Sequence, residues 1–303
     1  MQTSSFPREG MWLKGNYHSH TTLSDGMLSP EEQLRRYKLQ NYHFLAFTDH
    51  NAMNDRVQWN EGILMLPAWE RDILYGEKTK CTHIVGLFDL KSPSDTTLRR
   101  PKGDKHTITD QALIDQMRKD GNVFISIAHP TWSRMEPEEL LSLDHYHAIE
   151  VFNYGCECLS HEGHAEYLWD FLLRHGKRIF GIACDDTHGH TIKDDHFGGW
   201  MMVKSKAYDR QSIIEAMQAG HFYSTSGPEI HDWGIDEEGN AFITTSLCRE
   251  IHFITYPTRG KSFAGYLTET TFPLKGGETY VRVECIDFAG NKAWTNPIFL
   301  QDR

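Results

Sequence analysis

The sequence lacks the features that mark membrane-bound, secreted and nucleic-acid-binding proteins. No apolar run in its 303 residues approaches the roughly 20 residues that a transmembrane helix needs, and residues 1–10 lack the apolar core of a signal peptide. Basic residues are outnumbered, with 31 Lys and Arg against 42 Asp and Glu, and the formal net charge is −11. Such a surface disfavours polyanions. We therefore expect neither a nucleic acid nor a membrane as a partner.

The chain also lacks paired cysteines and the common nucleophile and phosphate-binding motifs. Its six cysteines are scattered, and none forms a CxxC pair, which is typical of buried, reduced thiols in a cytoplasmic protein. It contains no G-x-S-x-G elbow, no P-loop and no glycine-rich dinucleotide fingerprint. The sequence therefore gives no support for a disulfide framework or for a nucleotide-binding enzyme.

What the chain does contain is an apolar core arranged as alternating strands and helices. Hydrophobic residues make up 39% and aromatic residues 12%, enough for one large domain with or without a small appendage. From Trp12 to Ile230, strand-like and helix-like segments alternate in about seven βα units, which predicts an α/β fold with a distorted or closed (β/α)7 barrel. Helices are expected to begin after Ser29 and Thr109, and Gly121 is expected to end the second.

Past Ser226-Gly227-Pro228 the helix signals disappear. Short strands separated by glycine-containing turns are expected at Ala241–Thr245, Glu250–Thr255, Thr279–Cys285 and Lys292–Thr295. Strands without intervening helices predict a small β-sandwich. The predicted domains are therefore a barrel over residues 1–228 and a small β-rich domain over residues 229–303.

Imidazoles and carboxylates gather at the ends of the strand-like segments. His18 and His20 lie two residues apart on a strand, so both side chains point to one side and can reach one ion. Asp25 lies in the following loop and can fold back toward a second ion, while Glu70 follows an apolar strand and can bridge two ions with its two oxygens. This donor set suits Zn, Mn or Fe better than Mg or Ca. The pattern predicts two or three divalent transition metals at one end of a barrel or sheet.

Five motifs along the chain together resemble the PHP family, named for polymerase and histidinol phosphatase. They are His18-Ser-His20-Thr, Ser24-Asp25-Gly26, Thr48-Asp49-His50-Asn51, Ala128-His129-Pro130 and Asp186-Thr-His188. The resemblance implies a distorted seven-stranded PHP-type barrel with up to three metals, a trinuclear centre. Carried over position by position, it implies nine metal ligands: His18, His20, Asp25, His50, Glu70, His83, His129, Asp186 and His188. Asp25 stands where some members of the family carry histidine.

A narrower resemblance, to the CehA/McbA-type metallohydrolases, covers nearly the whole chain. It rests on segments such as Trp12–His18, Ala148–Asn153 and Gly220–Pro228. That branch includes enzymes that cleave carbamate esters, whereas the wider family is mostly described as phosphoesterase. Both resemblances imply a hydrolase that acts on its substrate with the help of its metals.

Several residues beyond the ligand set are candidates for catalysis or support. With Glu70, Asp186 and His188, the predicted catalytic residues are Arg134, whose guanidinium could hold an anionic substrate, and His190, which could donate a proton. The alternatives are a surface arginine and a solvated loop histidine. Side chains expected to orient ligands or to contact substrate are those of Asp49, Asp185, Asn153 and Ser226.

The predicted function is metal-dependent hydrolysis of a phosphoester in a small soluble molecule. Clustered metals can hold a bridging hydroxide as the nucleophile while they polarise the substrate oxygen. One alternative is hydrolysis of a carboxylic or carbamate ester on the same metals. An alternative of another class is a metal-stabilised binding or accessory module without catalysis.

Overall fold

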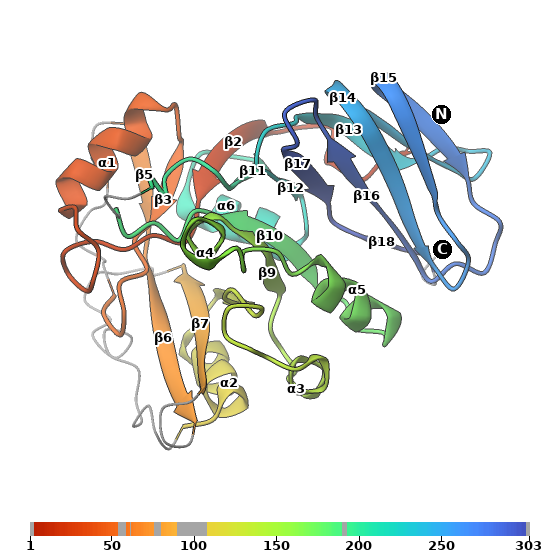
Figure 1. The fold of residues 1–303 in the computed structure, drawn as a ribbon. Coiled ribbons are helices and arrows are strands. Elements are labelled where there is room, and N and C mark those ends of the chain that lie inside the picture. The colour runs from red at the N-terminus through yellow and green to blue at the C-terminus, as the bar shows by residue number, and fades with distance from the viewer. Residues whose placement is uncertain are drawn as a thin grey trace.

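The protein has a mixed α/β fold built on two β-sheets (Figure 1). The computed structural model describes residues 3–53, 59–60, 62–75, 80–89, 108–189 and 193–300. Within these ranges no helix is long and apolar enough to cross a membrane. All six cysteines are free thiols, and four of them are buried.

The larger sheet has 13 strands among the described residues and runs through most of the molecule. Eleven follow one path, in the order β1-β13-β14-β16-β17-β12-β11-β2-β3-β5-β4, with β15 added beside β14 and β18 beside β16. Their bounds are β1 Thr3–Ser4, β2 Met11–Asn16, β3 Phe44–Ala46, β4 Trp59–Asn60, β5 Ile63–Leu66, β11 Trp200–Ser205, β12 Phe222–Thr225, β13 Ile230–Ile235, β14 Asn240–Tyr256, β15 Lys261–Pro273, β16 Tyr280–Ile286, β17 Lys292–Thr295 and β18 Ile298–Phe299.

The smaller sheet, as far as the structure describes the chain, has five strands in the order β10-β9-β8-β7-β6. Their bounds are β6 Ala68–Tyr75, β7 Lys80–Phe88, β8 Val123–Ile127, β9 Ala148–Asn153 and β10 Phe180–Cys184. Strands β8, β9 and β10 pair in parallel, as do β2, β3 and β5 of the larger sheet. Every residue of β8 and β9 is buried, as expected for parallel strands covered on both faces.

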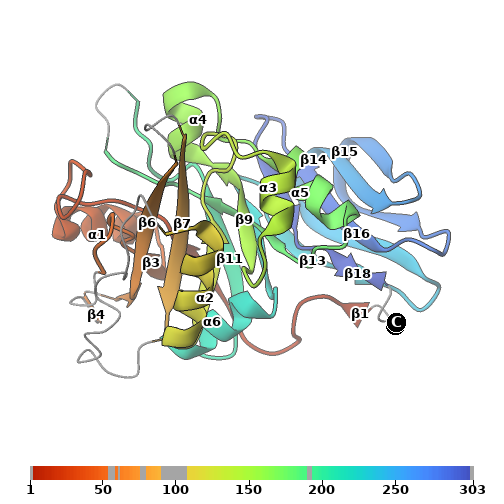
Figure 2. The ribbon, with the colours of Figure 1, turned by 90° about the horizontal axis from the view of Figure 1, so that it is seen from below.

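In the described ranges six helices connect or cover these strands: α1 Pro30–Leu39, α2 Asp110–Asp120, α3 Pro137–Ser142, α4 Tyr154–Ser160, α5 Glu166–Arg174 and α6 Arg210–Gln218. The predicted helix starts are confirmed, because the Ser29 and Thr109 hydroxyls accept hydrogen bonds from the first-turn N–H groups of α1 and α2. The predicted end of the second helix is also confirmed, because α2 ends at Asp120 and Gly121 follows it with a φ of 150°. Helix α2 lies against β7 and β8 through Leu113, Ile114 and Met117 (Figure 2).

The described strands do not close into the (β/α)7 barrel that the sequence predicts. After β5 the chain forms the antiparallel pair β6–β7 instead of a βα unit, and β7 pairs antiparallel with β8. Strands β11 and β12 are also antiparallel to their neighbours, including β2. These antiparallel additions leave two open sheets in the part of the chain that the structure describes.

The C-terminal strands continue the larger sheet. Strand β12 pairs with β17, and the N-terminal β1 pairs with β13. The two strands expected at Ala241–Thr245 and Glu250–Thr255 are one long strand, β14, and β15 is an additional strand beside it. These strands share a core in which Phe6 and Tyr223 pack with Trp233. The domain boundary after residue 228 stays a prediction.

Helix α5 and strand β17 are joined by the carboxylate of Glu166. Its Oε1 lies 2.8 Å from Lys292 Nζ and 3.1 Å from His164 Nδ1. Burial opposes the charged form, but the His164 and Lys292 contacts prevail and lower the pKa of Glu166 to about 2. The carboxylate therefore stabilises the fold above its unfolded pKa of about 4.5, and this stabilisation is lost as the pH falls toward 2.

We expect Glu166→Gln to lower the free energy of unfolding by about 1–2 kcal/mol near pH 7. The difference from the wild type should shrink as the pH falls below about 4.5, because the wild-type advantage requires the ionised carboxylate. Urea unfolding of the wild type and the variant between pH 7 and pH 2 measures this difference in free energy. Substitution of the exposed Glu229, Glu229→Gln, is the control. A difference that stays constant with pH would contradict the ionic role.

Candidate metal centre

A pocket of about 370 Å³ opens where the two sheets present the carboxyl ends of their parallel strands. Predicted metal ligands form much of its wall. The residues that line it are Asp25, His50, Glu70, His83, His129, Trp132, Gly155, Cys156, Leu159, Asp186, His188 and Asp195. Short backbone bridges join the segments that carry these side chains, Ser19 to Thr187 and His50 to Glu70. The fold therefore gathers side chains from both sheets around one cavity.

Glu70 lies at the centre of the imidazoles and is 1% exposed. Its Oε1 stands 2.9 Å from His83 Nδ1 and 3.3 Å from His129 Nε2. Its Oε2 stands 3.2 Å from both His20 Nε2 and His50 Nδ1. Burial favours the neutral acid, but the surrounding imidazoles, His83 foremost, hold the pKa of Glu70 well below its usual range. Each carboxylate oxygen thus faces a different set of nitrogens.

Asp186 occupies a second position among the histidines. Its Oδ1 lies 3.1 Å from His18 Nε2 and 3.1 Å from His20 Nε2. Burial opposes its ionisation, but the charges of His18, His20 and His188 lower the pKa of Asp186. Its other oxygen accepts a hydrogen bond from Asn153 Nδ2 at 3.0 Å. The carboxylate is therefore held by Asn153 on one side and faces the histidines on the other.

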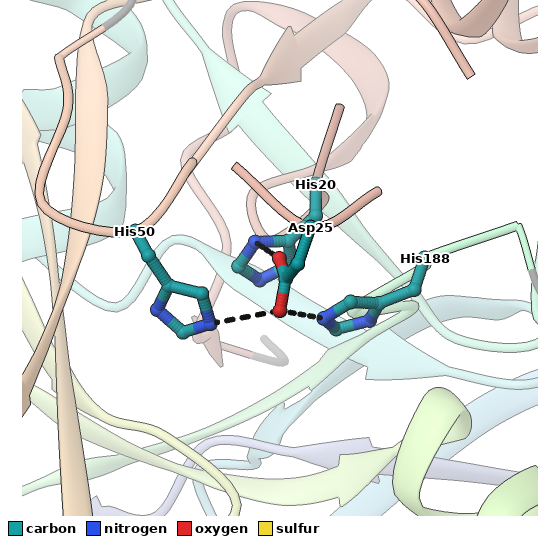
Figure 3. A group of neighbouring side chains, drawn as sticks. All are labelled: His20, Asp25, His50 and His188. Atoms are coloured by element: carbon teal, nitrogen blue, oxygen red, sulfur yellow. Dashed lines mark ion pairs between the residues drawn. The ribbon is translucent and has the colours of Figure 1, made fainter. Parts of the chain in front are cut away.

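Asp25 faces three imidazoles at the mouth of the pocket, where its side chain is 53% exposed. Its Oδ2 lies 3.5 Å from His50 Nε2 and 3.6 Å from His188 Nε2, and its Oδ1 lies 3.4 Å from His20 Nδ1 (Figure 3). The loop that carries Asp25 is fixed by Asp49, which accepts hydrogen bonds from Thr21 and Ser24. These contacts explain how a residue in a loop is brought back to the strand ends.

Two of the predicted ligands lie on sharply turned backbone. His129 has a φ of 25° and Asp186 a φ of 49°, values that are uncommon outside glycine. Hydrogen bonds hold both turns: His129 N donates to Glu150 Oε2 at 2.7 Å, and Asp186 N donates to His18 O at 2.9 Å. Such backbone costs of order 1–3 kcal/mol and is found most often at functional sites.

The arrangement of donors and acceptors fits bound cations. Because His18 Nδ1 faces Glu150 Oε1 at 2.6 Å, that nitrogen carries a proton, and in the neutral ring Nε2 presents a lone pair. The Nε2 atom lies 3.3 Å from His20 Nε2 and 3.1 Å from Asp186 Oδ1. Likewise, His188 donates from Nδ1 to the backbone oxygen of Asp186 at 3.0 Å, so in the neutral ring its Nε2 lone pair faces Asp25. Lone pairs that face one another are stabilised by a cation between them.

The buried polar atoms without a hydrogen bond agree with this interpretation. Among the described residues, such atoms include His50 Nδ1, Glu70 Oε2 and Asp186 Oδ1. Burying unpaired polar atoms is costly, and metal coordination is one way to satisfy them. Among the described residues, the donor groups made of predicted ligands alone that could hold an ion are His20 with Asp25, His50 and His188; His18 with His20 and Asp186; and His50 with Glu70 and His83. The structure thus brings all nine predicted ligands together, since His129 faces Glu70.

Glu150 is a central residue of the site that the sequence did not single out. It is fully buried on β9 and contacts His18 Nδ1 and the His129 N–H, as described above. It also accepts hydrogen bonds from the Tyr17 hydroxyl and from Asn153 Nδ2. No spacing rule marks it, because it lies within a wholly buried strand. Its contacts orient two predicted ligands from behind.

Asp195 plays a comparable part for the turn that carries His188. Its Oδ2 accepts a hydrogen bond from His188 N at 2.8 Å, and its Oδ1 accepts from Thr187 Oγ1 at 2.6 Å and Gly189 N at 3.1 Å. Asp185 is also engaged, by the Tyr37 hydroxyl and by the N–H groups of Gly198 and Gly199. Both carboxylates therefore hold loops, and Asp195 also forms part of the pocket wall.

Of the remaining predicted residues, Asn153 contacts a predicted ligand, whereas the others lie away from the imidazole cluster or outside the described residues. Arg134 is 63% exposed at its side chain, contacts Glu162 and is absent from the described pocket wall. Asn153 caps α4 in addition to holding Asp186, and Ser226 hydrogen-bonds with Lys292 of β17. His190 lies outside the described residues. The catalytic roles of Arg134 and His190 stay predictions.

Comparison with known proteins places the fold. No protein-family model and no curated protein sequence matches the chain. Among solved structures, a two-domain protein from Bacteroides vulgatus that contains a predicted PHP-like metal-dependent phosphoesterase matches with a TM-score of 0.51 at 15% identity, over 98% of both chains. A protein from Bifidobacterium adolescentis assigned as a metal-dependent phosphoesterase has a TM-score of 0.40 at 15% identity, over 71% of this chain and 97% of its own. An amidohydrolase from Chromobacterium violaceum with bound sulfate has a TM-score of 0.42 at 17% identity, over 67% and 96%.

At these identities the likeness concerns the fold alone, and of these three structures the Bacteroides vulgatus protein is the one with a TM-score above 0.5. It extends over the C-terminal strands as well as the region of the candidate metal centre, because it covers 98% of this chain. The narrower CehA/McbA-type resemblance stays a prediction. The fold of this chain is similar to that of a two-domain protein with a PHP-like module, in agreement with the motifs in its sequence.

Proposed function

We propose that the protein is a metal-dependent hydrolase of the PHP type that cleaves a phosphoester in a small soluble molecule. The observation that carries the proposal is the position of Glu70, buried among five imidazoles with its two oxygens facing different nitrogens. A carboxylate so placed suits a cluster of ions better than a single ion. The motifs and the fold similarity support the same class of enzyme.

The residues proposed to hold the ions are the nine ligands predicted from the sequence. Bound Zn, Mn or Fe would supply Lewis acidity and an activated water. The chain contributes the rest: Glu150 fixes the tautomer of His18, Asn153 orients Asp186, and Asp195 holds the turn of His188. Asp25 and His188 lie at the mouth, where they can meet an entering substrate.

A second candidate, hydrolysis of a neutral carboxylic or carbamate ester, is favoured by the pocket wall. No lysine or arginine lies among the described residues that line it, whereas Trp132, Cys156 and Leu159 supply apolar surface. The Trp132 ring stands 4.9 Å from that of His129, centroid to centroid. A phosphate bound here would therefore depend on the ions for its charge neutralisation. A neutral ester would need no further cation.

Esters that share one leaving group provide the decisive experiment. The substrates are p-nitrophenyl phosphate esters, p-nitrophenyl acetate and p-nitrophenyl N-methylcarbamate, and the protein is loaded with Mn or Zn. We expect kcat/KM for the phosphate esters to be at least about tenfold higher than for the other two, because clustered cations stabilise developing phosphoryl charge. The reverse preference would establish the second candidate. Full metal content without hydrolysis of any ester would favour a non-catalytic module.

Arg134 can be tested on the same substrates. If Arg134 holds a phosphate oxygen of the substrate, Arg134→Ala should weaken transition-state binding by about 1.5–3 kcal/mol. This corresponds to a roughly 10- to 150-fold lower kcat/KM, for phosphate esters only. Because its guanidinium contacts Glu162 and lies largely in solvent, we expect a change below about threefold on both ester classes. A large loss confined to phosphate esters would instead establish Arg134 as a substrate clamp. Glu162→Gln is the matched control for the loss of the ion pair.

A further inference from the structure

The predicted histidine ligands do not all turn the same ring nitrogen toward the centre of the cluster. His18, His129 and His188 each turn Nε2 toward a carboxylate of another predicted ligand. In each of these rings Nδ1 lies 3.1 Å or less from a hydroxyl, backbone or buried carboxylate oxygen on the other side. Metal-binding histidines are usually held in this way, because the partner of one nitrogen fixes which nitrogen carries the proton.

The ring of His83 has the opposite orientation. Its Nδ1 faces the cluster, 2.9 Å from Glu70 Oε1, and its Nε2 lies 3.1 Å from Cys81 Sγ. Residues two apart on a strand point to the same side, so β7 places this thiol beside the ring. Among the described residues, Cys81 is the only hydrogen-bond partner of His83 Nε2. A sulfur atom therefore occupies the position that oxygen atoms occupy behind the other three rings.

A thiol can serve this position whether or not an ion is bound. Its S–H group is a weak donor and its sulfur is a weak acceptor, whereas a carboxylate can only accept. In the metal-free neutral ring, Nδ1 donates to Glu70 and the Cys81 S–H can donate to Nε2. When Nδ1 gives its lone pair to an ion, the ring proton lies on Nε2 and is donated to Sγ. The S–H can then turn toward the backbone oxygen of Thr82, 4.0 Å from the sulfur.

We propose that Cys81 is a positioning residue for His83: its thiol accepts the Nε2 proton and so presents Nδ1 to an ion shared with Glu70. The donor group that it would serve consists of His50, Glu70 and His83. The unpaired and buried Glu70 Oε2 agrees with an ion at this place. The inference rests on the proposed function for the presence of the metals, but not on which ester is cleaved.

Zn titration of two variants at this position tests the contact. Cys81→Ala removes the partner of Nε2 and should raise the Kd of one Zn ion about tenfold, the lower end of the range for residues that orient ligands, because a thiol is a weak partner. Cys81→Ser keeps a side chain that both donates and accepts, and should bind Zn within about threefold of the wild type. Calorimetry of the full chain with a competing chelator measures each Kd without any substrate.

NMR spectroscopy measures the protonated nitrogen directly. In two-bond ¹H–¹⁵N spectra of the Zn-loaded protein labelled with ¹⁵N-histidine, His83 should carry its proton on Nε2 and bind Zn through Nδ1. His83→Gln identifies the His83 signals. Cys81→Ser should keep this pattern, whereas Cys81→Ala should show His83 in a mixture of both tautomers at Zn concentrations that saturate the wild type. A loss of packing alone would not change which nitrogen is protonated.

A second cysteine supplies the matched control. Cys158→Ala removes another partly exposed thiol, one that does not line the pocket, and should leave Zn binding unchanged. The Tm of each metal-free variant verifies folding. The inference is overturned if Cys81→Ala binds Zn like the wild type, if Cys81→Ser is as impaired as Cys81→Ala, or if the wild type binds His83 through Nε2 or binds no Zn. Zn binding that depends on Cys81, without hydrolysis of any ester, would overturn only the proposed reaction.

Discussion

Glu70→Ala should remove hydrolytic activity and cut the metal content of the purified protein. The side chain supplies the two oxygens that face His83, His129, His20 and His50, so its loss removes the group that can bridge neighbouring ions. Substitution of a residue that only orients metal ligands already lowers metal affinity or activity about 10–100-fold. Because Glu70 would itself contact the ions, we expect Glu70→Ala to lower kcat/KM by more than about 100-fold. Elemental analysis after loading with Mn or Zn measures the metal independently of any substrate.

Glu70→Gln distinguishes bridging from space filling. Glutamine keeps the volume of the side chain but replaces one acceptor oxygen by an NH₂ donor. If bridging is the role, Gln should be nearly as damaging as Ala for metal content and activity, while its Tm without metal stays closer to the wild type. Full metal content and activity in the Gln variant would show that Glu70 is not a shared ligand. That result would leave the ester preference untouched, since the preference is measured on the wild type.

The set of nine predicted ligands followed from the resemblance of five motifs to the PHP family, and the positions of His18 and His20 on one strand supported it independently. The alternation of side chains along a strand explains why His18 and His20 point the same way, and the structure places both beside Asp186. Asp25 was the least obvious member, because its loop had to fold back. The structure shows the means, with Asp49 holding Thr21 and Ser24 through hydrogen bonds.

The supporting carboxylates could not be predicted in the same way. Glu150 is 132 residues from His18 in the sequence and meets it only because β9 lies in the five-stranded sheet behind the histidines. Within the apolar strand Ala148–Asn153 a lone glutamate has no periodic signal. The sequence around Asp195 likewise gives no signal of its role, since its partners are mainly backbone N–H groups. Such contacts depend on tertiary structure and leave no local pattern.

Element types were easier to predict than sheet closure. Caps and stops are local, so the starts of α1 and α2 follow from Ser29 and Thr109 alone. Closure depends on the direction in which each strand pairs, and the apolar segments of β6 and β7 do not reveal that they form an antiparallel hairpin. Strand β15 was missed because most of its residues are exposed and no apolar alternation marks it.

Glu150→Gln is the second change with a large expected effect. It tests whether Glu150 orients the predicted ligands His18 and His129 through its hydrogen bonds. The wild-type carboxylate accepts from the Tyr17 hydroxyl, His18 Nδ1, His129 N and Asn153 Nδ2. A glutamine amide has one acceptor oxygen and turns an NH₂ group toward some of these donors. We expect metal affinity to fall about 10–100-fold, because His18 loses the contact that fixes its tautomer. The free energy of unfolding should fall by about 2–4 kcal/mol, since buried donors become unpaired.

Metal titration distinguishes loss of ligand orientation from loss of a shared ligand. If Glu150 acts by orienting ligands, saturating Mn or Zn should restore much of the activity of Glu150→Gln, whereas Glu70→Gln should stay inactive at any metal concentration. Glu157→Gln, a change to a partly exposed carboxylate on the neighbouring helix α4, is the matched control and should bind metal like the wild type. Unchanged metal affinity in Glu150→Gln, with only stability lost, would reduce Glu150 to a packing residue. Restored activity at saturating metal would instead show that this buried carboxylate sets how tightly the histidines hold their ions.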